Sequence, residues 1–462
     1  MKGGYVILIV VVLSVLGYFV VWSDLSLAPL PSCYDSDGGL DYYVRGYVRG
    51  NTIREYPSEC NKLKKAYDIT EIEIDAGSKT GISKVDSTPT RTSNVDLRQV
   101  PLALSPSMWA GYCKLYDVCI DSGALKEHYC SGGGGHSETY DCPWGCEDGA
   151  CVGRGFKVGV APIPRNFPGN ESEWFDAYMM VQEVGELATI QSTWRDSIEL
   201  SGEIPKFIND SGTYHDYFNF TPVYGINFFN QSSPTYDPFL NMTGNPINNW
   251  SNVDAREKYL ETALRICNDF NPEYLGLAVE VNSYEIDHYD DFVLFMGLYD
   301  IFHTAVKTNC PDTKVFVTFQ LETMKGIGYW DEEQWWMLDA FGDKLDLVVF
   351  TTYPEINYSS PEGIPLDYYS EITEHTNKKI AFSEIGWSST EGGEEAQVEF
   401  IDTFLERTEG LDMEFVNWIF MHDLPGEGPL FKTGLRYDNG TAKDAWFRWK
   451  ALKEVPYGGG SI

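Results

Sequence analysis

Eight short apolar runs, separated by segments of helical periodicity, constrain the fold of this chain more than any other feature. They lie between Phe156 and Met421. Strands alternating with helices over about 300 residues are typical of a parallel (β/α)8 barrel. The expected strands are Phe156–Ala161, Leu187–Thr193, Pro222–Phe229, Tyr274–Asn282, Lys314–Gln320, Leu345–Tyr353, Lys379–Glu384 and Glu414–Met421. The expected helices include Ala255–Phe270, Asp291–Thr308, Glu332–Ala340, Leu366–Thr376 and Glu395–Thr408.

Two of the expected strands carry a carboxylate near the C-terminal end. In KIAFSEIGWSS, a period of two places Ile380, Phe382 and Glu384 on one face. In YLGLAVEVN, Glu280 and Asn282 share a face in the same way. Burying an acid on an apolar strand is costly unless the acid is paired or used. Because function collects at the C-terminal ends of barrel strands, Glu280 and Glu384 are the candidate catalytic pair.

Two facing carboxylates can hydrolyse a glycosidic bond when one is protonated and the other ionised. The sequence predicts a protonated Glu280 and an ionised Glu384, with the Tyr353 hydroxyl as a donor to Glu384. Glu285 and Glu322 are rival acids. The other candidate substrate-binding residues, each of which could instead belong to the core, are Trp418, Gln320, Trp194 and Trp387.

Four stretches resemble the clan A retaining glycoside hydrolases: AVEVN, FTTYP, SEIGWSS and NWIF. Within that clan, the chain looks most similar to the endo-β-1,4-galactanases and endo-β-1,3-glucanases. The resemblance implies that Glu280 is the acid/base and Glu384 the nucleophile. The clan usually has Asn before the acid/base, but this chain has Val279, and Asn282 is the candidate replacement. Arg195 is the candidate for the clan's strand-two arginine.

The N-terminal run Tyr5–Trp22 contains no charged residue and lies between Lys2 and Asp24. This pattern predicts a transmembrane signal anchor, with a cleaved signal peptide as the alternative. The rest of the chain would then be extracytoplasmic, with a glycan substrate as its expected partner. A net charge of −35 argues against a nucleic-acid partner.

Ten cysteines, most of them in the N-terminal third, indicate an oxidising compartment. The alternative is a zinc site built from Cys142, Cys146 and Cys151 with His128 and His136. The stretch DCPWGCEDGACV resembles small Cys-rich modules of archaeal surface proteins. Cys267 and Cys310 form either a disulfide or two buried thiols. The disulfide candidates are Cys113, Cys119, Cys130, Cys142, Cys146, Cys151, Cys267 and Cys310.

The sequence therefore predicts an α/β protein: a (β/α)8 TIM barrel preceded by a transmembrane helix and a small disulfide-rich region of β-strands and loops. The expected activity is that of an extracytoplasmic, membrane-anchored retaining β-glycosidase that needs no cofactor or metal. The alternative is a catalytically inactive barrel that serves as a carbohydrate-binding or adhesive surface protein. The expected divisions are an anchor (1–24), a linker with a small β-rich region (25–110), a Cys-rich module (111–155), the barrel (156–455) and a tail (456–462).

Overall fold

The computed structural model describes residues 33–49, 72–74, 113–194, 212–215, 217–327 and 332–458. These residues form two compact units, one extending to Arg154 and including Gly458, the other running from Gly155 to Tyr457. The expected membrane span Tyr5–Trp22 lies outside the described residues. Within the described ranges, no helix combines the length and apolar character needed to cross a bilayer.

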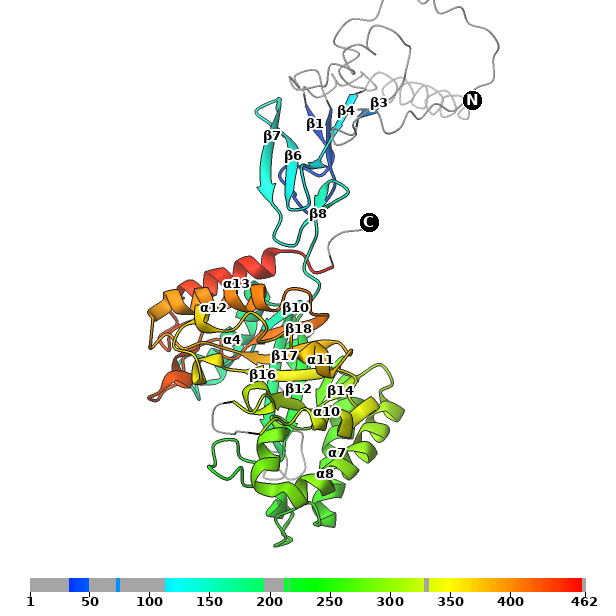
Figure 1. Cartoon of the computed structure of the whole chain (residues 1–462), viewed down its shortest axis with the longest axis vertical. Helices are drawn as coiled ribbons and strands as arrows, with labels where there is room; N and C mark the ends of the chain where they lie inside the picture. Colours follow the sequence, from blue (N-terminus) through cyan, green and yellow to red (C-terminus); the bar gives the residue numbers. More distant parts are fainter. Residues whose placement is uncertain are drawn as a thin grey trace, which may run out of the picture. The chain divides into compact units, whose positions relative to one another are not determined.

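The larger unit is built on a parallel barrel-like sheet in the order β14-β13-β12-β11-β10-β18-β17-β16-β15 (Figure 1). The expected strand Lys314–Gln320 is divided into β14 and β15. β14 pairs with β13 at one end of the sheet and β15 pairs with β16 at the other, so the divided strand supplies both ends of the sheet and joins them. The strands are β10 Lys157–Val160, β11 Leu187–Thr193, β12 Thr221–Asn227, β13 Tyr274–Gly276, β14 Lys314–Phe316, β15 Thr318–Gln320, β16 Val348–Thr352, β17 Ile380–Ile385 and β18 Met413–Trp418.

The barrel strands are buried along most of their length, as expected for a parallel sheet covered on both faces. Every residue of β16, β17 and β18 is buried. One cluster of buried side chains draws on most of the strands: Leu187, Val223, Tyr274, Phe316, Leu347, Val349, Ala381 and Phe415. This packing fixes the positions of the strand ends, where the candidate site lies.

Helices surround the barrel strands (Figure 1). Asn170 and Glu173 form a capping box at the start of the first helix, α4. Three expectations were wrong in extent. The helix expected at Asp291 begins at Val281 and is kinked at His288, and the helix expected at Glu332 begins at Trp336. Only Ile372–His375 of the expected Leu366–Thr376 is α-helical. The helices are α4 Glu171–Val184, α7 Val253–Phe270, α8 Val281–Asn309, α9 Leu321–Met324, α10 Trp336–Phe341, α11 Ile372–His375, α12 Gly393–Arg407 and α13 Asp444–Glu454. The short 3-10 helices are η1 Leu240–Thr243, η2 Gly342–Lys344, η3 Pro354–Ile356, η4 Pro361–Gly363 and η5 Pro429–Lys432.

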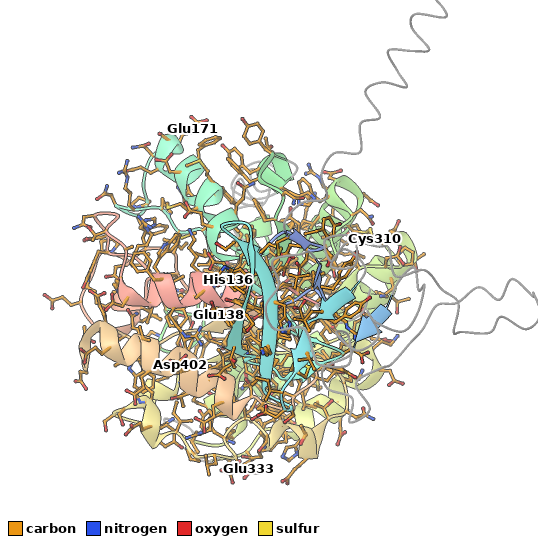
Figure 2. The ribbon with its side chains drawn as sticks, turned by 90° about the horizontal axis from the view of Figure 1, so that it is seen from above. His136, Glu138, Glu171, Cys310, Glu333 and Asp402 are labelled. Carbon is orange, nitrogen blue, oxygen red and sulfur yellow. A yellow bond between two sulfur atoms is a disulfide. The ribbon has the colours of Figure 1, made fainter. Side chains whose placement is uncertain are left out.

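A disulfide joins Cys267, near the end of α7, to Cys310, directly after α8. The sequence allowed either a disulfide or two buried free thiols at these positions, and the structure confirms the disulfide. Glu171, Glu333 and Asp402 are exposed acidic residues of this unit (Figure 2).

The amino ends of the barrel strands hold a network of charged side chains. Glu414 on β18 accepts hydrogen bonds from Tyr274 (2.8 Å) and Lys314, and an ion pair of 3.2 Å links it to Lys379. Nearby, the Lys157 ammonium group donates to Glu273 at 2.9 Å. Burial alone would raise the pKa of Glu414, but the bonds from Lys314 and Tyr274 lower it to about 2. Glu414 is therefore ionised at neutral pH.

The N-terminal unit contains small sheets. One has the order β1-β2-β4-β3 and a second the order β5-β6-β7. The first sheet pairs strands from the expected divisions 25–110 and 111–155, so their described parts belong to one folded unit. The strands are β1 Tyr34–Asp35, β2 Tyr47–Arg49, β3 Ile72–Ile74, β4 Cys113–Tyr116, β5 Val118–Cys119, β6 Ala124–Ser131, β7 Gly134–Asp141, β8 Cys146–Glu147 and β9 Ala150–Cys151. His136 and Glu138, which Figure 2 labels, lie on β7.

Disulfides join the cysteines of the N-terminal unit whose side chains the structure describes, as the sequence predicted. The N-terminal unit contains the bonds Cys33–Cys130, Cys119–Cys146 and Cys142–Cys151. The zinc alternative was wrong, because these bonds engage the three thiols that it required. The side chain of Cys113 lies outside the part that the structure describes, and no free cysteine occurs within that part.

Candidate active site

Glu280 lies beyond the end of its strand, not on it. β13 ends at Gly276, four residues earlier, and Glu280 directly precedes helix α8. Its backbone has a positive φ of 53°, in the left-handed region. A non-glycine residue there costs of order 1–3 kcal/mol, and such strain is concentrated at functional sites. The expectation that Glu280 and Asn282 share a strand face was therefore wrong.

Hydrogen bonds from three neighbouring segments hold Glu280 in place. The Thr351 hydroxyl on β16 donates to its Oε1 at 2.6 Å, and the Gln231 amide donates to its Oε2 at 3.0 Å. The backbone N–H of Glu280 donates to the Thr318 hydroxyl on β15 at 2.7 Å. The carboxyl group is thereby fixed near the ends of β15 and β16, while the residue remains partly exposed.

Glu384 lies on β17, where the sequence predicted it, and is 7% exposed. The Tyr353 hydroxyl donates to its Oε2 at 2.5 Å, which is the contact that the sequence predicted. The Gln191 side chain of β11 also donates to this carboxyl group. Thr351, which contacts Glu280, pairs in register with Glu384. The end of β16 thus contacts both carboxyl groups, through Thr351 and Tyr353.

Both carboxyl groups have raised pKa values. Burial raises the pKa of Glu280, against the lowering effect of the bonds from Thr351 and Gln231. Burial, and then repulsion by Glu280, raise the pKa of Glu384 to about 7, although Tyr353 and Gln191 donate to it. Two such groups titrate as a pair. The pair therefore retains a proton near neutral pH.

The raised pKa of Glu384 differs from the ionised state that the sequence predicted. The physical reason is the set of neighbours, because the described groups that shift the two pKa values are neutral donors and the glutamates themselves. Arg195, the expected cation of the site, lies outside the described residues.

Glu322 is a third buried acid near Tyr353. Its Oε1 accepts hydrogen bonds from the Thr352 hydroxyl (2.7 Å), the Tyr353 backbone N–H (3.1 Å) and the Tyr368 hydroxyl (2.8 Å). Its Oε2 accepts from Gln320. Because both oxygens are engaged, Glu322 fixes the ends of β15 and β16 and is not a free acid.

Asn282 and Gln320 do not occupy the sugar-binding roles that the sequence predicted for them. Asn282 is fully buried in the first turn of α8, where its amide donates to the Gln320 carbonyl and to Gln334. The Gln320 side chain caps helix α9 through Thr323 and donates to Glu322. Both side chains therefore join segments around the site, so Asn282 does not replace the missing asparagine at position 279.

The three candidate tryptophans belong to the core. Trp418 is fully buried, donates to the Thr433 carbonyl at 2.7 Å and packs against Trp449 of α13. Trp387 packs against Phe400 on α12, and Trp194 packs against Tyr259 on α7. The prediction that they contact substrate was wrong, because their side chains pack against the helix layer.

Sequence reasoning missed Thr351, Gln191 and Gln231. Thr351 could have been found, because it is two residues before Tyr353 and so shares its strand face. Gln191 gave no clear signal, because β11 contains other polar residues in its sequence LATIQST. Gln231 follows β12 in a loop, where periodicity gives no signal.

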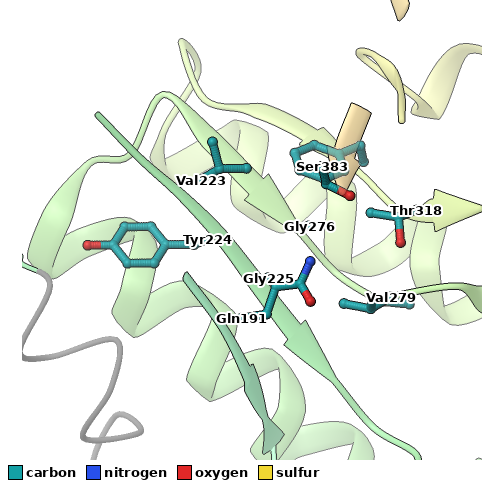
Figure 3. Close-up of a pocket in the computed structure, with 10 residues that line it drawn as sticks. Gln191, Val223, Tyr224, Gly225, Gly276, Val279, Thr318 and Ser383 are labelled. Atoms are coloured by element: carbon teal, nitrogen blue, oxygen red, sulfur yellow. The ribbon is translucent and has the colours of Figure 1, made fainter. Parts of the chain in front are cut away.

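Figure 3 shows a small cavity among the barrel strands. Gln191, Val279, Thr318 and Ser383 line it, and each contacts or precedes Glu280 or Glu384. Gly225 leaves space there, since a Cβ would lie 3.1 Å from the Gln191 Cγ. The side chain of Val279 thus faces the barrel interior and, being apolar, offers no hydrogen bond.

Comparisons with known proteins give structural likeness alone. No protein-family model and no curated protein sequence matches this chain. A GH5_18 structure from Bifidobacterium longum, in complex with Manβ1-4GlcNAc, is similar with a TM-score of 0.51 and 15% identity, covering 65% of this chain and 78% of its own. A GH5_18 structure from Streptomyces cattleya, in complex with GlcNAc, has a TM-score of 0.52 and 13% identity, covering 66% and 82%. At these identities the likeness establishes the fold, a (β/α)8 barrel of the kind found in clan A glycoside hydrolases.

Proposed function

We propose that this chain is a retaining β-glycosidase in which Glu384 is the nucleophile and Glu280 the acid/base. The observation that carries the proposal is the pair itself. Two carboxyl groups meet at the carboxyl ends of the barrel strands, interact electrostatically and contact Thr351 and Tyr353 on one strand end. Carboxyl pairs with unequal environments are the usual machinery for cleaving glycosidic bonds.

In the first step, the Glu384 carboxylate attacks the anomeric carbon while Glu280 gives its proton to the leaving oxygen. The bond to the leaving group breaks and an ester bond to Glu384 forms. In the second step, Glu280 takes a proton from water, whose oxygen attacks the anomeric carbon and releases Glu384. The Tyr353 hydroxyl orients Glu384 throughout, and the Thr351 hydroxyl orients Glu280.

The substrate class is a glycan. The structurally similar GH5_18 proteins were crystallised with Manβ1-4GlcNAc and GlcNAc, which supports a β-linked saccharide but does not identify the sugar. The galactanase or glucanase type to which the sequence looks most similar is one option. With Val279 in place of the usual asparagine, the 2-hydroxyl group of the sugar needs another donor in this site.

We also propose that Tyr5–Trp22 anchors the protein and that the barrel is extracytoplasmic. The disulfides Cys33–Cys130 and Cys267–Cys310 support an oxidising compartment. Protease added to intact cells should release the barrel, while Lys2 remains cytoplasmic. Recovery of the full chain from the medium, without detergent, would contradict the anchor.

The activity is tested with 2,4-dinitrophenyl β-glycosides of glucose, galactose, mannose and N-acetylglucosamine. We expect hydrolysis of at least one, with the β-anomer as first product by proton NMR. Glu280→Ala should retain activity on these substrates, because dinitrophenolate leaves without a proton. Glu384→Ala should be inactive, and azide should restore turnover with an inverted glycosyl azide as product.

Unchanged activity of Glu384→Ala, or an inverted first product from the wild type, would contradict the mechanism. Saturable binding of glycans with no turnover of any substrate would favour the alternative, a catalytically inactive carbohydrate-binding barrel. The presence of Val279 favours this alternative, because valine has no side-chain donor and the clan normally has asparagine at this position.

A further inference from the structure

Four acidic residues from distant parts of the sequence meet in the N-terminal unit. Asp35 lies on β1, Asp37 in the turn after it, Asp117 between β4 and β5, and Glu127 on β6. Carboxylate oxygens of Asp37, Asp117 and Glu127 all lie within 4.8 Å of one another, and Asp35 lies against Asp37. Asp117 is 1% exposed and Glu127 is fully buried. Isolated negative charges at such depth are strongly unfavourable unless something compensates them.

Backbone N–H groups hold part of this cluster and leave other oxygens without a partner. Cys130 donates to Asp35 Oδ2 at 2.9 Å, Asp41 donates to Glu127 Oε1 at 3.2 Å, and Gly46 and His128 donate to Asp117. Within this cluster, the buried oxygens that have no hydrogen-bond partner in the described chain are Asp35 Oδ1, both Asp37 oxygens and Glu127 Oε2. Since buried polar atoms are normally satisfied, these oxygens indicate a missing ligand.

Two neighbouring residues that are not acids, His128 and Gly46, also indicate a ligand site at this cluster. His128 is 2% exposed, and its Nδ1, which has no hydrogen-bond partner among the described residues, lies 3.6 Å from Asp117 Oδ1. At Gly46, a Cβ would lie 2.1 Å from Asp37 Oδ2 and 2.7 Å from Asp117 Oδ2. Glycine at this position therefore keeps open the space between the two carboxyl groups.

We propose that Asp35, Asp37, Asp117 and Glu127 bind one hard divalent cation, and that this cation is Ca²⁺. Calcium takes carboxylate oxygens in irregular arrangements of six to eight ligands, whereas Mg²⁺ requires near-ideal octahedral geometry. Soft metals are disfavoured, because the cysteines of this unit described with their side chains are in disulfides. Without a cation, burial and mutual repulsion raise the pKa of Asp37 to about 8 and that of Glu127 to about 9.

The cation would act as a cross-link. It would tie β1 and the turn after it to the link between β4 and β5 and to β6, next to the disulfide Cys33–Cys130. Small units with little apolar core generally need such cross-links to stay folded. The site is independent of the glycosidase proposal, because none of its residues belongs to the barrel unit.

The test uses the full-length chain, stripped with EDTA and dialysed, then titrated with CaCl₂ by isothermal calorimetry. We expect saturable binding with a Kd at or below about 10⁻³ M, the range of extracellular calcium modules. Glu127→Gln should weaken binding at least about tenfold, because it removes a charged ligand at the buried centre. Glu147→Gln, an exposed change in the same unit, is the matched control and should leave the titration unchanged.

A second measurement guards against misfolding of the variant. Calcium should protect the wild-type N-terminal unit from proteolysis, and EDTA should remove that protection. The proposal is overturned if the wild type neither binds Ca²⁺ nor gains protection up to about 10 mM, well above the expected Kd. Equal binding by Glu127→Gln and Glu147→Gln, or binding of Zn²⁺ with no response to Ca²⁺, would also overturn it.

Discussion

Glu414 and Glu384 belong to adjacent strands of the barrel, β18 and β17, and are almost equally buried, at 6% and 7% exposed. Each accepts a hydrogen bond from a tyrosine, Tyr274 at the amino end of the strands and Tyr353 at the carboxyl end. Yet the pKa of Glu414 is lowered to about 2 and that of Glu384 is raised to about 7. Burial and tyrosine donation therefore do not decide the charge state.

The remaining neighbours decide it. Around Glu414, the ammonium groups of Lys314 and Lys379 compensate a buried negative charge. Around Glu384, the charged group that shifts its pKa is another carboxyl group, Glu280, which raises it. At the amino end, ionised acids whose charge is compensated by lysines stabilise the barrel. At the carboxyl end, acids without a neighbouring cation retain a proton that catalysis can use.

The largest expected effect separates the two ends by activity. Glu384→Gln should lower kcat by about 10⁴-fold or more, as loss of a nucleophile does. Glu414→Gln should leave kcat within about threefold of wild type at temperatures where it is folded, because Glu414 is at the other end of the strands. Initial rates on the best dinitrophenyl glycoside measure both. Equal losses of kcat in the two variants would contradict the distinction between a catalytic carboxyl end and a structural amino end.

The same chemical change at the two tyrosines sharpens the comparison. Tyr353→Phe removes the donor to Glu384 and should lower kcat by about 10–100-fold, the effect of losing a hydrogen bond to a charged group. Tyr274→Phe removes the matching donor to Glu414 and should leave kcat unchanged. Steady-state kinetics with both variants decide the matter, and a large kcat effect of Tyr274→Phe would contradict the assignment.

Stability should respond with opposite sign at the two ends. The pKa of Glu414 is lower in the folded protein than the ordinary value of 4.5, so its contribution is present above pH 4.5 and is lost as the pH falls toward 2. Glu414→Gln should therefore destabilise the barrel at pH 7 by about 3 kcal/mol, because the pKa is lowered from 4.5 to about 2.

Glu384 gives the contrasting case. Its raised pKa means that folding stability decreases as the pH rises from 4.5 to 7. Glu384→Gln should be neutral or stabilising at pH 8, by up to about 2 kcal/mol. Urea unfolding of both variants at pH 5 and 8 measures the signs. Destabilisation by Glu384→Gln that increases with pH would contradict the account.

The smallest expected effect is a shift in the pH profile. Because Glu384 attacks as a carboxylate, kcat/KM should rise by up to about tenfold per pH unit as the pH approaches 7 from below. Because the Tyr353 donor lowers the pKa of Glu384, Tyr353→Phe should move this limb to higher pH. Tyr274→Phe should not move it, and an unmoved limb in Tyr353→Phe would show that another group titrates.

The sequence predicted the barrel because its strands are continuous apolar runs that alternate with helical patterns. Strand four was overextended, because Leu277, Ala278 and Val279 continue the apolar pattern although β13 ends at Gly276. Periodicity reports burial, and these residues remain buried after the regular strand has ended. For the same reason, the sequence predicted Asn282 on a strand face, whereas Asn282 lies in the first turn of α8.

Within the site, the sequence predicted the two glutamates and Tyr353, which lie at strand ends. It could not distinguish a tryptophan in the core from one facing substrate, because both are apolar and buried, as Trp418 and Trp387 show. The pKa of Glu384 was also out of reach, because it depends on which charged groups lie near it in space.

The most direct test of the comparison is carbon-13 NMR of protein labelled at the glutamate side-chain carboxyl carbons. Resonances of Glu384 and Glu414 are assigned by their loss in Glu384→Gln and Glu414→Gln. Glu384 should titrate near pH 7, and Glu414 should remain ionised down to about pH 3, below the usual range of a glutamate. Titration of both resonances near pH 4.5 would show that the two ends of the barrel do not hold their acids differently.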